Sequence, residues 1–203
     1  MLALLCLAMP WGAAQAFDAY VQQAEAQLAQ AAGATVEVEG GLIHDWSSEA
    51  FVPGRTAEQV LAVLQRYERY GEIYPEVTAS RLLAREGNRF RVALQLKRKK
   101  VLTVILNTES LVEYEKLGEG RWRVLSRSTK VEEADGGDHG FLWRLNAYWT
   151  VTTEAGGVRL QCRSISLSRD VPLGLGWAVK PLVQGMPQES LAGMLAATVK
   201  ALR

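Results

Sequence analysis

From Val77 onward, hydrophobic and polar residues alternate with a period of two, the pattern of strands that bury one face. This pattern predicts strands at 77–85, 89–97, 101–114, 121–131, 141–153 and 158–167. Glycine-containing turns such as Gly87-Asn88 and Gly156-Gly157 separate most of them. Because short connections join antiparallel neighbours, we expect one antiparallel sheet.

Helices and one further strand are predicted before these six strands. Residues 17–33 carry an apolar stripe at helical spacing and are predicted to form a helix. Residues 42–52 are predicted to be the first strand. A helix is predicted from Ala57 to about Tyr67, begun by a capping box between Thr56 and Gln59, and a second short helical segment follows it.

The chain is also predicted to end in a helix. Pro187 suits the first position of a helix of about four turns whose apolar stripe includes Leu191 and Leu195. The Gly- and Pro-rich stretch 172–185 is predicted to be a loop with a short helix. Its first part, through Trp177, is either a mobile lid over a cavity or a structural turn with Trp177 as a plug.

A sheet with one apolar face must cover that face, and the C-terminal helix is the long amphipathic element available to cover it. The sequence therefore predicts an α+β fold. A curved antiparallel sheet of about six to seven strands wraps around the long C-terminal helix, with two short helices after the first strand.

The first sixteen residues carry no charged side chain. An apolar run at 2–9 leads to Ala14-Gln15-Ala16, the pattern of a signal peptide cleaved after Ala16, and it is too short to span a membrane. The alternative is a short helix packed on the domain. We therefore expect a signal peptide at 1–16, a helical appendage at 17–39, a domain at 40–203, and export to the periplasm or medium.

Several of these motifs resemble the START-like superfamily, also called SRPBCC or helix-grip proteins, and in particular its polyketide cyclase/dehydrase-like and coenzyme-Q-binding-like branch. The resemblance rests on 51–64, Tyr74-Pro75-Glu76-Val77, Gly176-Trp177 and 183–202. Two positions depart from the family pattern: Arg66 stands where Asp is frequent, and Leu61 where a bulky aromatic is common. The resemblance implies the fold and an affinity for sterols, lipids, quinones or polyketides; some members are cyclases or hydrolases, so fold does not settle activity.

The strand 141–153 suggests where a ligand would bind. Its odd-numbered residues, including Trp143, Leu145 and Trp149, are predicted to face the concave side, and its even-numbered residues to lie nearer solvent. Such a surface is either the wall of a ligand cavity or simple core packing. The candidate ligand-binding residues are Leu94, Leu96, Leu102, Val104, Leu106, Trp143, Leu145, Trp149, Leu160 and Trp177.

The charged residues indicate which partners the chain is expected to bind. The net charge of +1, from 23 basic and 22 acidic residues, gives no basis for nucleic-acid binding. The run Lys97, Arg98, Lys99 and Lys100 is either a solvated hairpin end or a transient contact with anionic lipid headgroups.

Reactive side chains give no assembled catalytic set. The pairs His44-Asp45 and Asp138-His139 are sequence neighbours, so on a strand their side chains point to opposite faces. A metal site would require the fold to join them, and a general acid–base role for His44 stays open. Cys162 is predicted to be a core residue. We assign no catalytic residue, metal or cofactor.

The sequence thus favours a protein that binds or transports a hydrophobic small molecule in an internal cavity, rather than an enzyme. The alternative is a cyclase or dehydratase that uses the same cavity, with His44 or a buried carboxylate as base. A second alternative is an interaction module whose own side chains fill the cavity.

Overall fold

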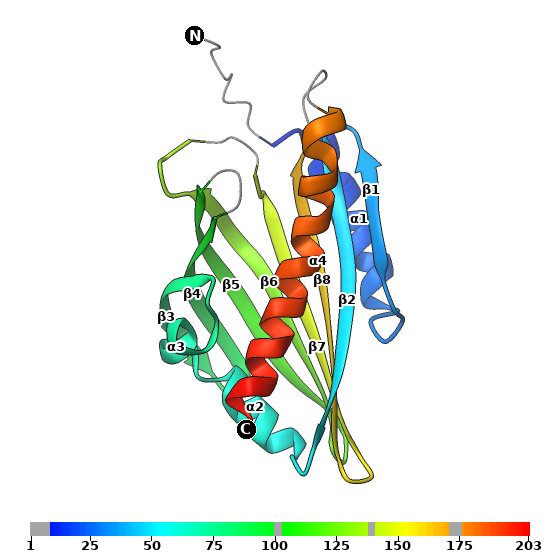
Figure 1. Cartoon of the computed structure of the whole chain (residues 1–203), viewed down its shortest axis with the longest axis vertical. Helices are drawn as coiled ribbons and strands as arrows, with labels where there is room; N and C mark the ends of the chain where they lie inside the picture. Colours follow the sequence, from blue (N-terminus) through cyan, green and yellow to red (C-terminus); the bar gives the residue numbers. More distant parts are fainter. Residues whose placement is uncertain (1–8, 100–102, 138–140, 171–175) are drawn as a thin grey trace.

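We describe the protein from a computed structural model, which covers residues 9–99, 103–137, 141–170 and 176–203, without the side chains of 176–184 and 186. Its helices and strands follow in chain order (Figure 1). They are α1 (Trp11–Glu25), β1 (Gly33–Val38), β2 (Gly41–Pro53), α2 (Ala57–Leu64), the 3-10 turn η1 (Tyr67–Arg69), α3 (Tyr70–Ile73), β3 (Val77–Glu86), β4 (Arg89–Lys99), β5 (Thr103–Gly118), β6 (Arg121–Glu133), β7 (Arg144–Glu154), β8 (Gly157–Arg169) and α4 (Gly176–Ala201).

One antiparallel sheet of eight strands forms the centre of the molecule, in the order β1-β2-β8-β7-β6-β5-β4-β3. The α+β class, the curved sheet and the long C-terminal helix agree with the prediction, but the sheet has more strands than the six to seven expected. The strand that the prediction missed is β1, which pairs Gly33–Val38 with Gly41–Trp46. Most of its residues are exposed, so it lacks the alternation that identified the other strands.

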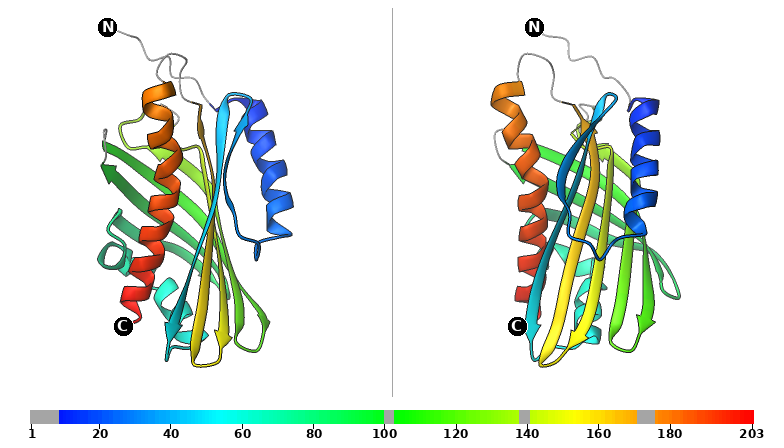
Figure 2. Two further views of the ribbon diagram at one scale, coloured as in Figure 1. Left: turned by 45° about the vertical axis from the view of Figure 1, so that its right-hand side comes forward. Right: turned by 90° about the vertical axis from the view of Figure 1, so that its right-hand side faces the viewer.

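Helix α4 lies across the concave face of the sheet, against β2 and β8, whereas α1 lies on the opposite, convex face (Figures 1 and 2). Each face has its own buried hydrophobic cluster. We call the first the α4-side core; it joins α2 and α4 to strand residues that include Trp149, Val151 and Leu160. The second, the α1-side core, joins Ala13 and Phe17 of α1 to residues that include Ile165 and Leu167.

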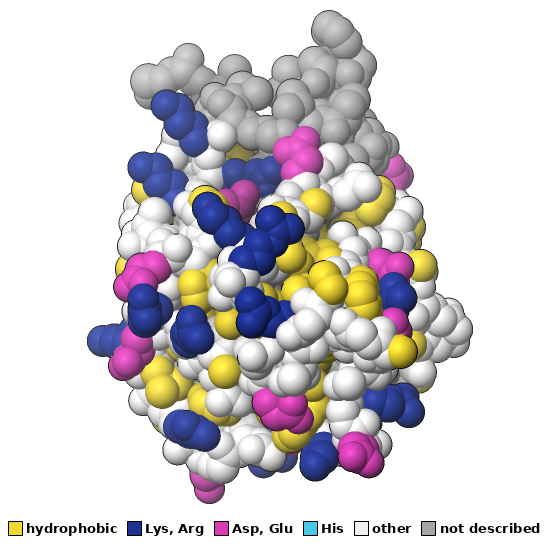
Figure 3. Space-filling view, turned by 60° about the horizontal axis from the view of Figure 1, so that its bottom comes forward, with side chains coloured by type: hydrophobic (Ala, Val, Ile, Leu, Met, Phe, Trp, Pro, Cys, Tyr) yellow, Lys and Arg dark blue, Asp and Glu magenta, His cyan; other side chains and the backbone are white. Residues whose placement is uncertain are grey.

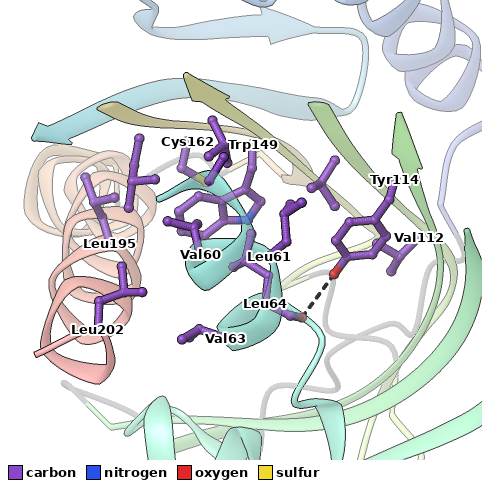
Figure 4. Close-up of a cluster of buried hydrophobic side chains, with 14 of the residues drawn as sticks. Val60, Leu61, Val63, Leu64, Val112, Tyr114, Trp149, Cys162, Leu195 and Leu202 are labelled. Atoms are coloured by element: carbon purple, nitrogen blue, oxygen red, sulfur yellow. Dashed lines mark hydrogen bonds between the residues drawn. The ribbon is translucent and has the colours of Figure 1, made fainter. Parts of the chain in front are cut away.

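Helix α2 fills the narrow end of the concave side. Its predicted capping box is present: Thr56 accepts a hydrogen bond from Gln59 N–H, and the Gln59 side chain accepts one from Thr56 N–H. Figure 4 shows its apolar residues packed between the sheet and the last turns of α4, and the hydroxyl of Tyr114 donates to Leu64 O at 3.1 Å.

Helix α1 corrects two expectations. It runs from Trp11 to Glu25 rather than over 17–33, so it passes through the predicted cleavage position after Ala16. It also covers the convex face, which was expected to lie nearer solvent. As a result Asn146 and Tyr148 are buried, and the hydroxyl of Tyr148 donates to Glu25 at 2.8 Å.

Helix α4 is longer than predicted. It begins at Gly176, so Pro187 lies inside it rather than at its first position, and most of the stretch expected to be a loop is helical. Residues 171–175 of the predicted lid lie outside the described part of the chain. The C-terminal half of α4 is anchored by the buried side chains Leu191, Leu195, Thr198 and Leu202. Within the described chain, no helix is both long enough and apolar enough to cross a membrane.

Candidate functional site

The concave face has two halves with different packing. The half beside α2 and the end of α4 is filled: Trp149, Val151 and Leu160 are at most 5% exposed. Tyr114 and Tyr67 close this half, with their hydroxyls 2.7 Å apart. We call it the packed half. Trp149 and Leu160, both predicted to contact ligand, therefore belong to the core.

The half toward the start of α4 is not filled by the side chains that the structure describes. Leu94 and Leu96 of β4, Val104 of β5 and Leu145 of β7 face the concave side but are only half-buried, although their strands are interior to the sheet. A side chain in this position becomes buried when another layer packs on it. We call this region the open half. It contains four of the predicted ligand-binding residues, and Leu106, which is buried, borders it.

Trp143 does not lie on this face, so its predicted position on the concave side is wrong. It packs in the α1-side core with Phe17 and Leu167. The alternation begins only with β7 at Arg144, because residues 141–143 bend before entering the sheet. The backbone N–H of Trp143 still donates to Leu167 O at 2.7 Å, and Phe141 is exposed.

Two other predicted ligand-binding residues cannot be placed. Leu102 lies outside the described residues. Trp177 is in the second position of α4, but its side chain is outside what the structure describes. Both remain predictions.

His44 is buried on the concave face of β2, 2% exposed, with both ring nitrogens hydrogen-bonded. Nδ1 lies 3.1 Å from Thr35 Oγ1 and Nε2 lies 3.0 Å from Ser168 Oγ, and Ser168 Oγ donates to Arg169 O at 3.3 Å. Donation from Thr35 to Nδ1 and from Nε2–H to Ser168 satisfies every group with a neutral imidazole. Burial lowers the pKa of His44 to about 4, which keeps it neutral near pH 7.

A row of serines continues from Ser168 along the concave face of β8. Ser166 pairs with His44 and Leu145, and Ser164 pairs with Trp46 and Ala147. The regular alternation of these serines is visible in the sequence, but only the strand register shows that they face the open half.

A groove of about 350 Å³ runs beside this row, between the edge of the sheet and α4. Gly33, Thr35 and Trp46 line it from the sheet, and Gly185 and Gln188 from the helix. At Gly185 an added Cβ would meet open space, so the helix does not press on the sheet there.

The acidic neighbour of His44 points away from it, as the sequence predicted. Asp45 lies on the convex face, where Arg163 and Tyr20 bind it. No group of three or more metal-ligating side chains occurs among the described residues. Cys162 is fully buried in the α4-side core, as predicted, and burial raises its pKa.

The basic run at the end of β4 is divided in the structure. Lys97 and Lys99 are exposed, whereas Arg98 binds Glu76 at 3.0 Å and Glu189 of α4 at 3.1 Å. Arg98 therefore ties the sheet to α4 and is not available as a surface contact. Lys100 lies outside the described residues.

Comparison with known families identifies the class of protein. Residues 54–164, more than half of the chain, match the family described as polyketide cyclase / dehydrase and lipid transport. The chain belongs to this family, within the START-like superfamily that the sequence resembles. A search of curated proteins found no match.

Solved structures share the fold. A STAR-related lipid transfer protein from Xanthomonas axonopodis has a TM-score of 0.61 at 19% identity, over 84% of this chain and 98% of that one. The Zhui aromatase/cyclase from a Streptomyces species has a TM-score of 0.61 at 12% identity, over 79% and 93%. Human STARD10 has a TM-score of 0.56 at 15% identity, over 98% and 83%. At these identities the likeness concerns the fold alone.

Proposed function

We propose that this protein binds and carries a hydrophobic small molecule, such as a lipid, quinone, sterol-like or polyketide-like compound, in the open half of its concave face. The observation that carries the proposal is the incomplete burial of Leu94, Leu96, Val104 and Leu145 on interior strands. Covering apolar surface of this kind stabilises a complex by roughly 25 cal/mol per Å². The family description, which includes lipid transport, supports the same function.

The test is binding of 1-aminoanthracene, an uncharged apolar fluorophore, followed by its fluorescence. Leu145→Trp places a larger side chain in the open half and should weaken binding at least about tenfold, since it occupies the space that a guest needs. Leu111→Trp is the matched control, because Leu111 is 50% exposed on the convex side of β5. Absence of binding by the wild-type protein, or equal binding by both variants, would contradict the proposal.

A cyclase or dehydratase activity in the same site is the second candidate. Two buried titratable residues on the concave face favour it: His44, and Glu133, which pairs with Leu106 and accepts a hydrogen bond from Phe141 N–H. The test is incubation with a linear poly-β-keto thioester, with the products followed by mass spectrometry. Cyclised product that disappears in Glu133→Gln would establish an enzyme, whereas an unaltered substrate in the complex supports a carrier.

We also propose that the exposed Lys97 and Lys99 contribute to a transient contact with anionic membranes during ligand exchange. Figure 3 shows a face of the molecule on which hydrophobic side chains are exposed beside Lys and Arg side chains. Co-sedimentation with vesicles containing phosphatidylglycerol should fall in Lys97→Ser/Lys99→Ser and in high salt. Equal sedimentation with uncharged vesicles would contradict this role.

A further inference from the structure

Three polar side chains lie together at one end of the open half. The indole Nε1 of Trp46 is buried without a hydrogen bond. Ser164 and Ser166, which are 9% and 4% exposed, place two hydroxyls beside it on the same face of the sheet. We call these three residues the Trp46 patch.

The members of this patch are neighbours in the sheet. Trp46 on β2 pairs directly with Ser164 on β8, and Ser166 follows two positions later on the same face. On the other side of β8, Ser164 pairs with Ala147 and Ser166 with Leu145. The patch therefore adjoins the apolar wall of the open half, and Trp46 also lines the groove beside α4.

A buried N–H or O–H that lacks a partner costs free energy, so native proteins pair such groups with protein, water or ligand. His44 and Ser168, next along the row, bind each other, and their remaining hydrogen bonds are made with Thr35 and Arg169 O. The indole N–H of Trp46 is not completed in this way. Two hydroxyls and one N–H suit an oxygen atom that accepts hydrogen bonds.

The charge around the patch restricts which oxygen it accepts. His44, the nearest titratable residue of the row, is neutral near pH 7, and the positive charge of Arg98 on β4 is balanced by Glu76 and Glu189. A carboxylate or phosphate would lose its hydration there without gaining a counter-charge. A hydroxyl or carbonyl group is uncharged, so the hydration it loses is smaller and hydrogen bonds from the patch can replace it.

We propose that the Trp46 patch binds the uncharged oxygen-bearing end, a hydroxyl or carbonyl group, of an otherwise apolar ligand whose hydrocarbon part lies along Leu145 and Leu94. This inference rests on the proposed function and specifies its ligand class. It makes the β2–β8 side of the site the determinant of ligand polarity, and the β4–β5 side the apolar wall.

The experiment compares four ten-carbon compounds, decan-1-ol, decan-2-one, decanoate and decane, as competitors of 1-aminoanthracene at pH 7.5. The wild-type protein should bind the alcohol and the ketone about tenfold more tightly than decane, from one to two hydrogen bonds, and decanoate more weakly than the alcohol. Comparison of decan-1-ol with decan-2-one distinguishes a site for a hydroxyl group from a site for a carbonyl group.

The variants are Ser164→Ala/Ser166→Ala and Trp46→Phe, which remove the polar groups and keep the packing. Both should lose the preference for the alcohol and the ketone, measured against decane within the same variant. Ser80→Ala is the control, because Ser80 is a half-buried serine on β3, away from the patch.

The outcomes separate this inference from the function on which it rests. Equal affinity of the wild type for all four compounds, a preference for decanoate, or a preference that survives in the variants would overturn the patch while leaving the carrier function in place. No binding of 1-aminoanthracene or any competitor would overturn both.

Discussion

Arg163 binds Asp45 through two parallel hydrogen bonds on the convex face, Nε to Oδ1 at 2.8 Å and Nη2 to Oδ2 at 2.6 Å. The pair is almost completely buried, and it continues to α1 and the turn after it: Tyr20 of α1 donates to Asp45 Oδ2, and Arg163 Nη1 donates to Gln27 O in the turn. Because these bonds join β2 and β8 to α1, the pair fixes the helix on the outside of the sheet.

Asp45→Asn should therefore destabilise the fold by about 3 kcal/mol, because it leaves the Arg163 charge buried without a counter-charge. The free energy of unfolding from urea titration measures the effect. Glu72→Gln, which breaks the exposed Arg69–Glu72 pair, is the control and should leave stability almost unchanged. Similar losses of unfolding free energy in the two variants would contradict the prediction, because the buried Asp45–Arg163 pair would then stabilise the fold no more than an exposed pair does.

His44 predicts how stability depends on pH. Its pKa is lowered to about 4 in the folded protein, against an ordinary value of 6.5, so the unfolded chain binds the extra proton between these values. The stability that neutral His44 contributes is fully present above pH 6.5 and is lost as the pH falls toward 4. This loss lowers the free energy of unfolding by up to about 3 kcal/mol.

Urea titrations at several pH values check this for the wild type and His44→Asn. Other acid-sensitive groups titrate in both proteins. One is Glu25, for which burial opposes ionisation but hydrogen bonds from Arg127 and Tyr148 lower the pKa. The difference between the two profiles isolates His44, and parallel profiles between pH 6.5 and 4 would exclude the assignment.

The N-terminal segment leads to a third prediction. We propose that the chain is exported and cleaved after Ala16, which would remove the first residues of α1, including the buried Ala13. Phe17, Tyr20 and Glu25 would remain to hold the rest of the helix. The intact mass of the exported protein should correspond to a chain that begins at Phe17, and Ala16→Leu should block this processing. An exported protein that retains Trp11 would instead favour α1 as a permanent part of the domain.

Local signals in the sequence predicted most of the fold. The capping box at Thr56 involves residues three positions apart, and the alternation in β4 and β5 needs only neighbouring positions to be visible. The concave position of Leu94, Leu96, Val104 and Leu145 followed from this alternation. Strand β1 was missed because its side chains are mostly exposed, so burial left no pattern in its sequence.

The errors concern contacts between distant parts of the chain. Trp143 was misplaced because the bend before β7 depends on packing against α1, which alternation does not record. The Asp45–Arg163 pair joins residues 118 positions apart, and the Trp46 patch depends on the register of β2 against β8. Neither relationship has a local signature from which it could have been predicted.

Pro187 gives the two halves of α4 different mechanical properties. A proline inside a helix has no N–H, so the carbonyl four residues earlier loses its hydrogen bond and the helix is easier to bend at that turn. Beyond it, Leu191, Leu195 and Leu202 bind the helix to the packed half. A bend at Pro187 would therefore leave these contacts, and the packed half that they stabilise, in place.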